Sequence, residues 1–296
     1  ATDLLNLPRH LGQHSGGMVL CAGRLDDVVP LEPASMPNRT IVQWDKDDCA
    51  DLGIVKVDLL GLGMLAVLED AVPIIRAHEG IELDYAHLPP DDETVYGMLR
   101  AADTVGVFQV ESRAQMATLP RMKPERFYDL VVEVALIRPG PIQGGMVHPY
   151  LRRRAGREAV TYPHPSLEPI LARTLGVPLF QEQLMKVAVA AAGFSPSDSD
   201  RLRRAMGARR SRKAMDALLD RLQSGMRENG YDEAVVESIV AQIVGFADYG
   251  FPEAHAASFA VLVYASAYLK CYHPVEFYAA LYNAQPMGFY SPATIA

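Results

Sequence analysis

The spacing of apolar positions divides the chain into a short N-terminal part with strand character and a longer part with helical character. Within the first 60 residues, the β-branched runs "GGMVL", "TIVQW" and "GIVKVD" are separated by stretches rich in Gly and Pro. Short runs bounded by turn residues predict strands. From about residue 64, apolar residues recur with a helical period. The chain is therefore expected to be α+β, with a small β-containing portion over residues 1–62 and a larger all-α portion over residues 63–296.

The helical part contains start and stop signals for individual helices. The stretch "MLAVLEDAVPIIRAHEG" predicts a helix that buries Leu65, Leu68 and Val72 and ends at Gly80. Gly193 is expected to end a later helix, because glycine readily adopts the left-handed conformation that often follows a last turn. Further helices are predicted in "PERFYDLVVEVALI", "YDEAVVESIVAQIVGFADYG" and "HPVEFYAALYNA", and over residues 211–230 and 254–269.

The stretch "SPSDSDRLRRAMG" carries the most complete helix start signal. Ser195 is the expected N-cap, Pro196 fits the first helical position, and Asp198 lies where a capping-box acid belongs. Gly207 is expected to end this helix. The acids of "DSD" also have the spacing of a metal-binding pair, but capping and the helix dipole explain both of them.

Length and composition allow a packed core and indicate a cellular context. About half of the 296 residues are apolar, and the three cysteines are far apart, which is typical of free thiols in a reducing compartment. The longest nearly apolar run, residues 254–269, is shorter than the roughly 20 residues of a membrane span. A cytoplasmic protein is therefore expected. The start at Ala1, without a signal peptide pattern, indicates an excised fragment or a processed chain.

Charge is distributed unevenly along the chain. The net charge is −8, but residues 150–213 contain 13 Lys and Arg against 5 Asp and Glu. The flanking segments 1–149 and 214–296 are acidic. A basic block of this kind indicates a polyanionic partner. A solvated helix face that is rich in arginine explains the block equally well at this stage.

One carboxylate stands alone in the apolar stretch "LGIVKVDLLGLGML". Burial of Asp58 would cost free energy unless the carboxylate is paired, hydrogen-bonded or bound to a metal. In a strand, Lys56 and Asp58 lie on the same face, and Gly61 and Gly63 allow a tight turn into the next helix. Metal-dependent phosphoryl transfer uses a carboxylate at such a strand end. A cap for the next helix and a surface Lys–Asp pair remain alternatives, and a helix–hairpin–helix turn is disfavoured because the preceding residues are β-branched.

Seven of the thirteen residues in "RLRRAMGARRSRK" are cationic. Arginine guanidinium groups bind phosphate through two parallel hydrogen bonds. Arg201 and Arg204 share a helix face, whereas Arg203 is rotated about 100° from Arg204, so a shared phosphate ligand would lie near the helix end. The alternative is a set of nonspecific contacts to a DNA backbone. The cluster continues past Gly207 with Arg209, Arg210, Arg212 and Lys213.

Other stretches give no firm site. The acidic "WDKDDCADLG" fails as a calcium loop, because Ala50 occupies the position that requires glycine, and it is interpreted as a solvated acidic loop. His255 lies in a small-residue helix and is interpreted as a core or groove residue rather than a metal ligand.

Several long motifs together resemble one family. The stretches "LPRHLGQHSGGMVL", "GIVKVDLLGLGML", "GVFQVESRAQM", "ALIRPGPIQGGMV", "RLRRAMGARR" and "FADYGFPEAHAASFAVLVYASAYLKCYHPVEFYAALYNA" resemble bacterial C-family DNA polymerases, the DNA polymerase III alpha subunits and their relatives. The resemblance covers nearly the whole chain in the family's order. The ending "NAQPMGFYSPATI" resembles the error-prone, damage-tolerant branch more than the replicative branch.

The resemblance implies specific roles. Asp58 matches the third catalytic aspartate of a polymerase-beta-like palm and is expected to bind Mg²⁺. Lys56, Arg203 and Arg204 are expected near the incoming dNTP triphosphate, and residues 1–62 would be the C-terminal part of the palm, followed by the fingers over 63–296. Roles for Arg138 and His255 are not assigned. Primer-template DNA, a sliding clamp and accessory polymerase proteins are the expected partners. The remaining basic residues, Arg201, Arg209, Arg210, Arg212 and Lys213, are expected to contact the DNA backbone.

The chain also departs from the family pattern. The family's first two metal-binding aspartates and its triphosphate loop have no counterpart here, and one aspartate cannot hold two metal ions. The chain by itself is therefore expected to lack polymerase activity, although its parent would add dNTPs to a primer in error-prone translesion synthesis and DNA repair. Two alternatives stay open: a fragment of a replicative DNA polymerase III alpha subunit, and a noncatalytic helical module that binds nucleic acid.

Overall fold

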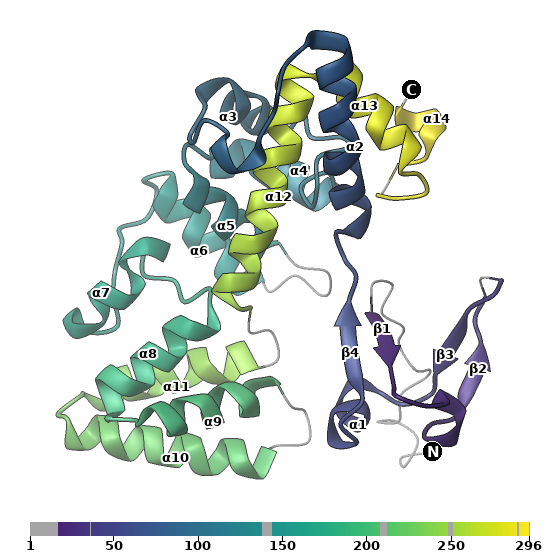
Figure 1. Cartoon of the computed structure of the whole chain (residues 1–296). Coiled ribbons are helices and arrows are strands. Elements are labelled where there is room, and N and C mark those ends of the chain that lie inside the picture. The colour runs from purple at the N-terminus through teal and green to yellow at the C-terminus, as the bar shows by residue number, and fades with distance from the viewer. Residues whose placement is uncertain are drawn as a thin grey trace, which may run out of the picture. The chain divides into compact units, whose positions relative to one another are not determined.

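The computed structural model describes residues 17–35, 37–137, 144–207, 212–247, 251–288 and 290–295. Backbone contacts divide the chain into two compact units, Ala1–Gly63 and Met64–Ala296. All the strands that the structure describes lie in the first unit, and the second unit is helical in its described parts (Figure 1). The expected α+β class is therefore confirmed.

The first unit contains two antiparallel strand pairs within its described residues. Strand β1 (Gly17–Leu20) pairs with β4 (Val55–Asp58), and β2 (Leu31–Pro33) pairs with β3 (Thr40–Val42). Three of these strands fall in the predicted runs. Strand β2 was not predicted, because its stretch reads as turn residues. Pro33 fits at the end of this short strand, where a missing N–H costs little.

The β1–β4 ribbon has one apolar face that is largely exposed. Met18 lies opposite Val57 and Leu20 lies opposite Val55, so these four side chains share a face. Met18, Leu20 and Val55 are 51%, 51% and 58% exposed. Lys56 and Asp58 lie on the other face, as the strand period predicts.

The acidic stretch before β4 is helical, so its interpretation as a loop was wrong. Helix α1 (Lys46–Asp51) begins after Asp45, whose Oδ1 accepts a hydrogen bond of 2.9 Å from the Asp48 N–H. The Asp45 N–H donates in turn to Asp48 Oδ2 at 3.4 Å. This reciprocal cap explains why acids cluster there, because they satisfy free N–H groups at the helix start.

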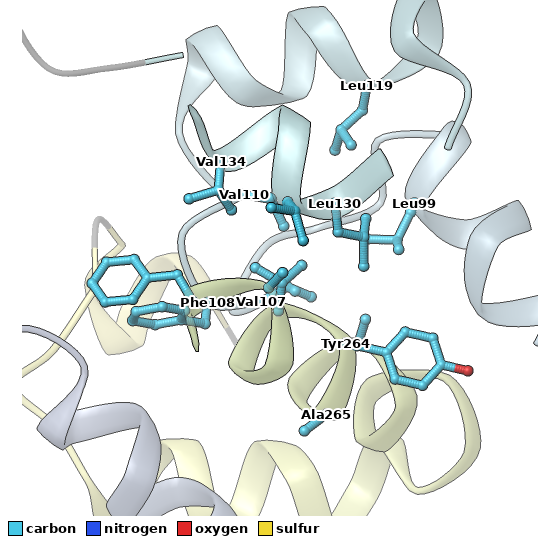
Figure 2. Close-up of a cluster of buried hydrophobic side chains, with 14 of the residues drawn as sticks. Leu99, Val107, Phe108, Val110, Leu119, Leu130, Val134, Tyr264 and Ala265 are labelled. Carbon is cyan, nitrogen blue, oxygen red and sulfur yellow. The ribbon is translucent and has the colours of Figure 1, made fainter. Parts of the chain in front are cut away.

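The second unit is built around helix α12 (Glu253–Tyr272), which packs most extensively against α5 (Phe127–Leu136). Helices α3 (Glu93–Arg100) and α13 (Pro274–Asn283) also pack on α12. Side chains from α3, α4 (Arg113–Met122), α5, α12 and the buried turn between α3 and α4 meet in one hydrophobic core, called the first core here (Figure 2). Leu99, Val107, Val110, Leu119 and Leu130 are fully buried there.

Helix α2 (Leu62–Glu79) buries a face that matches the predicted one only in part, because Leu68 is buried as predicted but Leu65 is not. Its buried residues are Met64, Val67, Leu68, Ala71 and Ile75, which recur at helical spacing. Leu65 is 47% exposed, so the prediction was wrong for this residue, and Val72 is only half-buried. Apolar residues occupy nearly every position at the start of this helix, so the sequence pattern does not select one face. The helix is followed by Gly80 in the left-handed conformation (φ +71°), as predicted.

A second hydrophobic core is formed by four helices that are consecutive in the sequence. Helices α8 (Gln181–Ala192), α9 (Pro196–Gly207), α10 (Arg212–Glu228) and α11 (Glu233–Ala247) surround buried Leu184, Leu202 and Leu222. Gly193 follows α8 in the left-handed conformation, as predicted. The other short elements of the unit are η3 (Tyr85–His87), η4 (Pro165–Leu167), α7 (Glu168–Leu171), η5 (Ala172–Thr174) and α14 (Pro292–Ile295), and η2 (Leu25–Asp27) belongs to the first unit. Within the described residues, no helix combines the length and apolarity that a bilayer crossing requires.

The predicted start of α9 is confirmed, whereas the residues after Gly207 lie outside the described residues. The Asp198 N–H donates to Ser195 Oγ at 3.2 Å, and the Ser195 N–H donates to Asp198 Oδ2 at 3.2 Å. Asp198 also pairs with Arg221 Nη1 on α10 at 2.6 Å. The Ser195 hydroxyl and the Arg221 guanidinium lower the pKa of the Asp198 carboxyl to about 2. One carboxylate therefore caps α9 and ties it to α10.

A largely buried ion pair fixes the helices beneath α12. Arg154, the last residue of α6 (Gly144–Arg154), donates to both oxygens of Asp129 on α5, at 2.9 and 2.7 Å. Arg154 also donates to the backbone carbonyls of Met122 and Lys123 at the end of α4. Asp129 Oδ2 accepts a further hydrogen bond from the Glu125 N–H at 2.9 Å. The pair therefore connects α4, α5 and α6.

Replacement of Arg154 by Met is expected to lower the free energy of unfolding by about 3–5 kcal/mol, because it leaves the Asp129 carboxylate buried without its partner. Urea denaturation monitored by circular dichroism measures this loss. Arg157→Met is the matched control, since Arg157 is exposed, and it is expected to change stability by under about 0.5 kcal/mol. A loss below about 1 kcal/mol for Arg154→Met would show that the pair does not secure the three helices.

Candidate active site

Asp58 is the last residue of β4 and is exposed. Its Oδ1 accepts a hydrogen bond of 2.9 Å from the Leu60 N–H, which forms a tight turn before α2. Gly61 follows with φ +98°, a conformation that side chains disfavour. Asp58 is exposed although its neighbours in the sequence are apolar. The free-energy cost of a buried carboxylate therefore does not arise. The local hydrogen bond instead holds the carboxylate at the strand end.

Within the described part of the chain, the second carboxylate oxygen of Asp58 has no bonding partner. Its Oδ2 accepts no hydrogen bond from the residues that the structure describes and forms no ion pair with them. An exposed carboxylate oxygen held by a turn is the kind of hard ligand that Mg²⁺ binds. Lys56 lies two residues earlier on the same strand face and is also exposed. The described residues thus place one acid and one cation side by side on the ribbon.

Arg203 and Arg204 are exposed residues of α9, and both bind Asp200. Arg203 donates to Asp200 Oδ1 from Nε at 3.0 Å and from Nη2 at 2.8 Å. Arg204 donates to Asp200 Oδ2 from Nε at 2.8 Å and also from Nη2. Arg204, and then Arg203, hold the pKa of the Asp200 carboxyl below its usual value. The two guanidinium groups therefore converge on one anionic group, as a shared phosphate would require.

Asp200 is the residue of this site that the sequence analysis missed. It was interpreted as a helix cap together with Asp198, but only Asp198 caps the helix. The available signal was spacing, because Asp200 precedes Arg203 by three residues and Arg204 by four, and such pairs meet on a helix. Surface ion pairs of this type contribute only about 0–1 kcal/mol, so an anionic ligand can displace Asp200.

Several arginines of the basic block bind other parts of the protein. Arg154 binds Asp129, and Arg153 donates to the Leu175 carbonyl at 2.7 Å. Arg152 and Arg153 share the carboxylate of Glu158. These groups serve the fold, so the net charge of the block overstates what is available to a partner. Arg173 lies 3.9 Å from the centre of the Tyr128 ring.

The structure describes only some of the other residues that were predicted to contact DNA or that were left without a role. Arg201 is exposed on α9. Arg209 and Arg210 lie outside the described residues, as does Arg138, and Arg212 and Lys213 begin α10 with side chains that are not described. His255 lies between Phe251 and Phe259, with ring centres 5.2 and 4.1 Å away, which agrees with its interpretation as a packed residue. Asp58 belongs to the first unit and the arginines to the second, so their convergence stays a prediction.

Comparison with known proteins identifies the class of the chain. A family model described as "Bacterial DNA polymerase III alpha NTPase domain" matches residues 1–61. A second model, "Bacterial DNA polymerase III alpha subunit finger domain", matches residues 64–230. The chain belongs to the bacterial DNA polymerase III alpha subunit family.

The chain is also similar along its whole length to individual proteins that are named error-prone DNA polymerase. The chain is 60% identical over 296 residues to "Error-prone DNA polymerase" of Mycobacterium bovis. The match covers all of this chain and 27% of that protein. Proteins with the same name from Corynebacterium jeikeium and Anaeromyxobacter dehalogenans are 60% and 58% identical, with 26% and 27% of their lengths covered. The chain thus spans about a quarter of the curated relatives that it matches.

The competition between Asp200 and a phosphate ligand can be tested directly. Asp200→Asn is expected to tighten the binding of a polyphosphate anion, with inorganic triphosphate as the probe, about two- to fivefold, because it removes a competing carboxylate worth up to about 1 kcal/mol. Titration calorimetry at fixed ionic strength measures the dissociation constant. Glu228→Gln removes the same charge from an exposed position on α10 and is expected to have no such effect. Equal changes in both variants would assign the gain to net charge instead.

Proposed function

We propose that the chain comprises the C-terminal part of the palm and the fingers of an error-prone DNA-directed DNA polymerase. The single observation that carries this proposal is 60% identity along all 296 residues to proteins named error-prone DNA polymerase. The order of the two matched family models supports it, since the first contains Asp58 and the second contains Arg203 and Arg204.

The proposed reaction is template-directed addition of a dNTP to a primer end. The primer 3′-hydroxyl attacks the alpha phosphorus of the dNTP, the bond to the leaving phosphate breaks, and pyrophosphate departs. Mg²⁺, when bound, supplies charge neutralisation and lowers the pKa of the attacking hydroxyl. In this chain, Asp58 would provide one oxygen ligand, and Lys56 lies beside it on the same strand face.

Arg203 and Arg204 would bind the triphosphate after exchanging Asp200 for phosphate oxygens. The exchange keeps both guanidinium groups paired before and after binding, so the protein never exposes two unpaired converging cations. Hydrogen bonds from paired guanidinium groups also fix the orientation of the triphosphate, and orientation supplies much of the rate in phosphoryl transfer.

The chain by itself is proposed to be inactive. Asp58 belongs to no group of three or more metal-ligating side chains among the described residues, whereas two-metal catalysis needs carboxylates that bridge both ions. Primer-template DNA and dNTPs are the proposed substrates of the longer protein. A sliding clamp, accessory polymerase proteins, translesion synthesis and a cytoplasmic location are part of the same proposal.

Asp58→Asn in the longest natural chain that contains these residues is expected to lower the rate of nucleotide incorporation by about a hundredfold or more, because an amide is a poor metal ligand. Affinity for primer-template DNA is expected to stay unchanged. Single-turnover primer extension and fluorescence anisotropy measure the two quantities. The 296-residue chain, assayed in parallel, is expected to give no extension. Unchanged incorporation by the variant would favour a noncatalytic nucleic-acid-binding module.

The double variant Arg203→Ala with Arg204→Ala is expected to raise the apparent KM for dNTP by about tenfold or more, since charge-assisted hydrogen bonds to phosphate are lost. Arg157→Ala is a control that removes an exposed arginine of the same basic block. Steady-state primer extension by the longest natural chain that contains these residues, over a range of dNTP concentrations, measures KM. If only DNA affinity falls, and its dependence on salt weakens, the two arginines are backbone contacts instead.

A further inference from the structure

A second group of possible metal ligands lies far from Asp58 in the sequence, where the end of α2 meets the start of α13 (Figure 1). His78 and Glu79 are the last residues of α2, and Glu276 lies in the first turn of α13. One ligand atom from each of these three side chains lies within 4.8 Å of the other two. The imidazole and the carboxylates come from segments almost 200 residues apart, so the fold alone brings them together.

A fourth side chain supports the cluster. His273, the residue before α13, places Nδ1 2.8 Å from Glu79 Oε1. Its side chain is only 8% exposed, so the hydrogen bond holds the Glu79 carboxylate in a fixed direction. An imidazole that orients a ligating carboxylate in this way is a common outer partner in metal sites.

The burial and charge of the cluster favour a cation. The Glu276 side chain is 3% exposed and contacts the His78 imidazole, whose own side chain is 64% exposed. Two carboxylates within 4.8 Å of one another repel unless a positive charge lies between them.

We propose that His78, Glu79 and Glu276 bind a divalent transition-metal ion of the Zn²⁺ class, with His273 as the residue that positions Glu79. One imidazole and two carboxylates suit Zn²⁺, whereas Mg²⁺ prefers oxygen ligands alone. The exposed His78 leaves an entry path for the ion. The bound ion would link the C-terminal end of α2 to α13, and this site is independent of the role proposed for Asp58.

Zn²⁺ titration of the chelator-treated chain tests the proposal. The titration is done in a Cys21→Ser background, since this exposed thiol is itself a possible zinc ligand. One Zn²⁺ per chain is expected, with Mg²⁺ in excess unable to displace it. Co²⁺ in place of Zn²⁺ is expected to give visible absorption bands that report nitrogen and oxygen ligation.

His78→Ala is the decisive variant, because it removes the exposed imidazole ligand. It also leaves the buried Glu276 carboxylate without this partner, so circular dichroism of the variant first establishes that it is folded. Loss of an outer partner alone lowers metal affinity by about 10- to 100-fold, so loss of this ligand is expected to weaken Zn²⁺ binding at least about a hundredfold. His273→Asn is expected to weaken it less. The matched control is His87→Ala. His87 is an exposed histidine that pairs with one carboxylate, with His87 Nδ1 2.6 Å from Asp84 Oδ2. Among the described residues, His87 belongs to no group of three possible metal ligands.

Two results would overturn the proposal. The first is the absence of stoichiometric Zn²⁺ binding to the parent chain, which would leave two histidine–glutamate pairs as a purely structural connection. The second is binding that His78→Ala leaves unchanged, which would place the ion elsewhere. Thermal unfolding with and without Zn²⁺ gives an independent reading, because only an ion bound at this site raises the Tm of the parent and of His87→Ala but not of His78→Ala.

Discussion

The bidentate ion pair between Arg154 and Asp129 is the interaction on which the helical unit depends. Asp129 is almost fully buried on the helix that packs most extensively on α12, so an unpaired carboxylate there would destabilise the centre of the first core. Arg154 satisfies the acid and also binds the backbone carbonyls that end α4. One guanidinium group therefore links three helices, and one of them is α5, on which the long α12 packs.

The same chemistry divides the arginines of this chain into two groups. Arg152, Arg153 and Arg154 bind acids and carbonyls of their own neighbourhood, and they stiffen the connection between the two cores. Arg203 and Arg204 instead lie on an exposed helix face and bind one exposed carboxylate. The first group is bound to groups that the fold needs, whereas the second is paired with one exposed carboxylate, Asp200. A count of charges along the sequence does not distinguish them.

The local signals in the sequence predicted much of the fold and part of the site. Ser195, Pro196 and Asp198 determined the start of α9, because a cap depends only on residues within one turn. Leu65 shows where such reasoning fails: α2 is apolar on several sides, and only its neighbours in space select the buried face. Asp58 was placed correctly at a strand end, but its exposure could not be read from its apolar neighbours, because those neighbours are exposed too.

Contacts between distant segments were beyond local patterns altogether. Glu276 and His78 are separated by 198 positions, and neither lies in a motif that suggests a partner. Arg154 likewise has no feature that distinguishes it from the two arginines before it. Such residues acquire their roles from the tertiary arrangement, which the spacing of residues along one helix does not encode.

The exposed apolar face of the β1–β4 ribbon has a practical consequence for anyone who purifies the chain. Short strands with open edges and uncovered aliphatic side chains act as templates for self-association. In the described part of the chain, Met18, Leu20 and Val55 are about half exposed, so self-association of the chain would act on this ribbon, and a polar replacement at Met18 or Leu20 would reduce it.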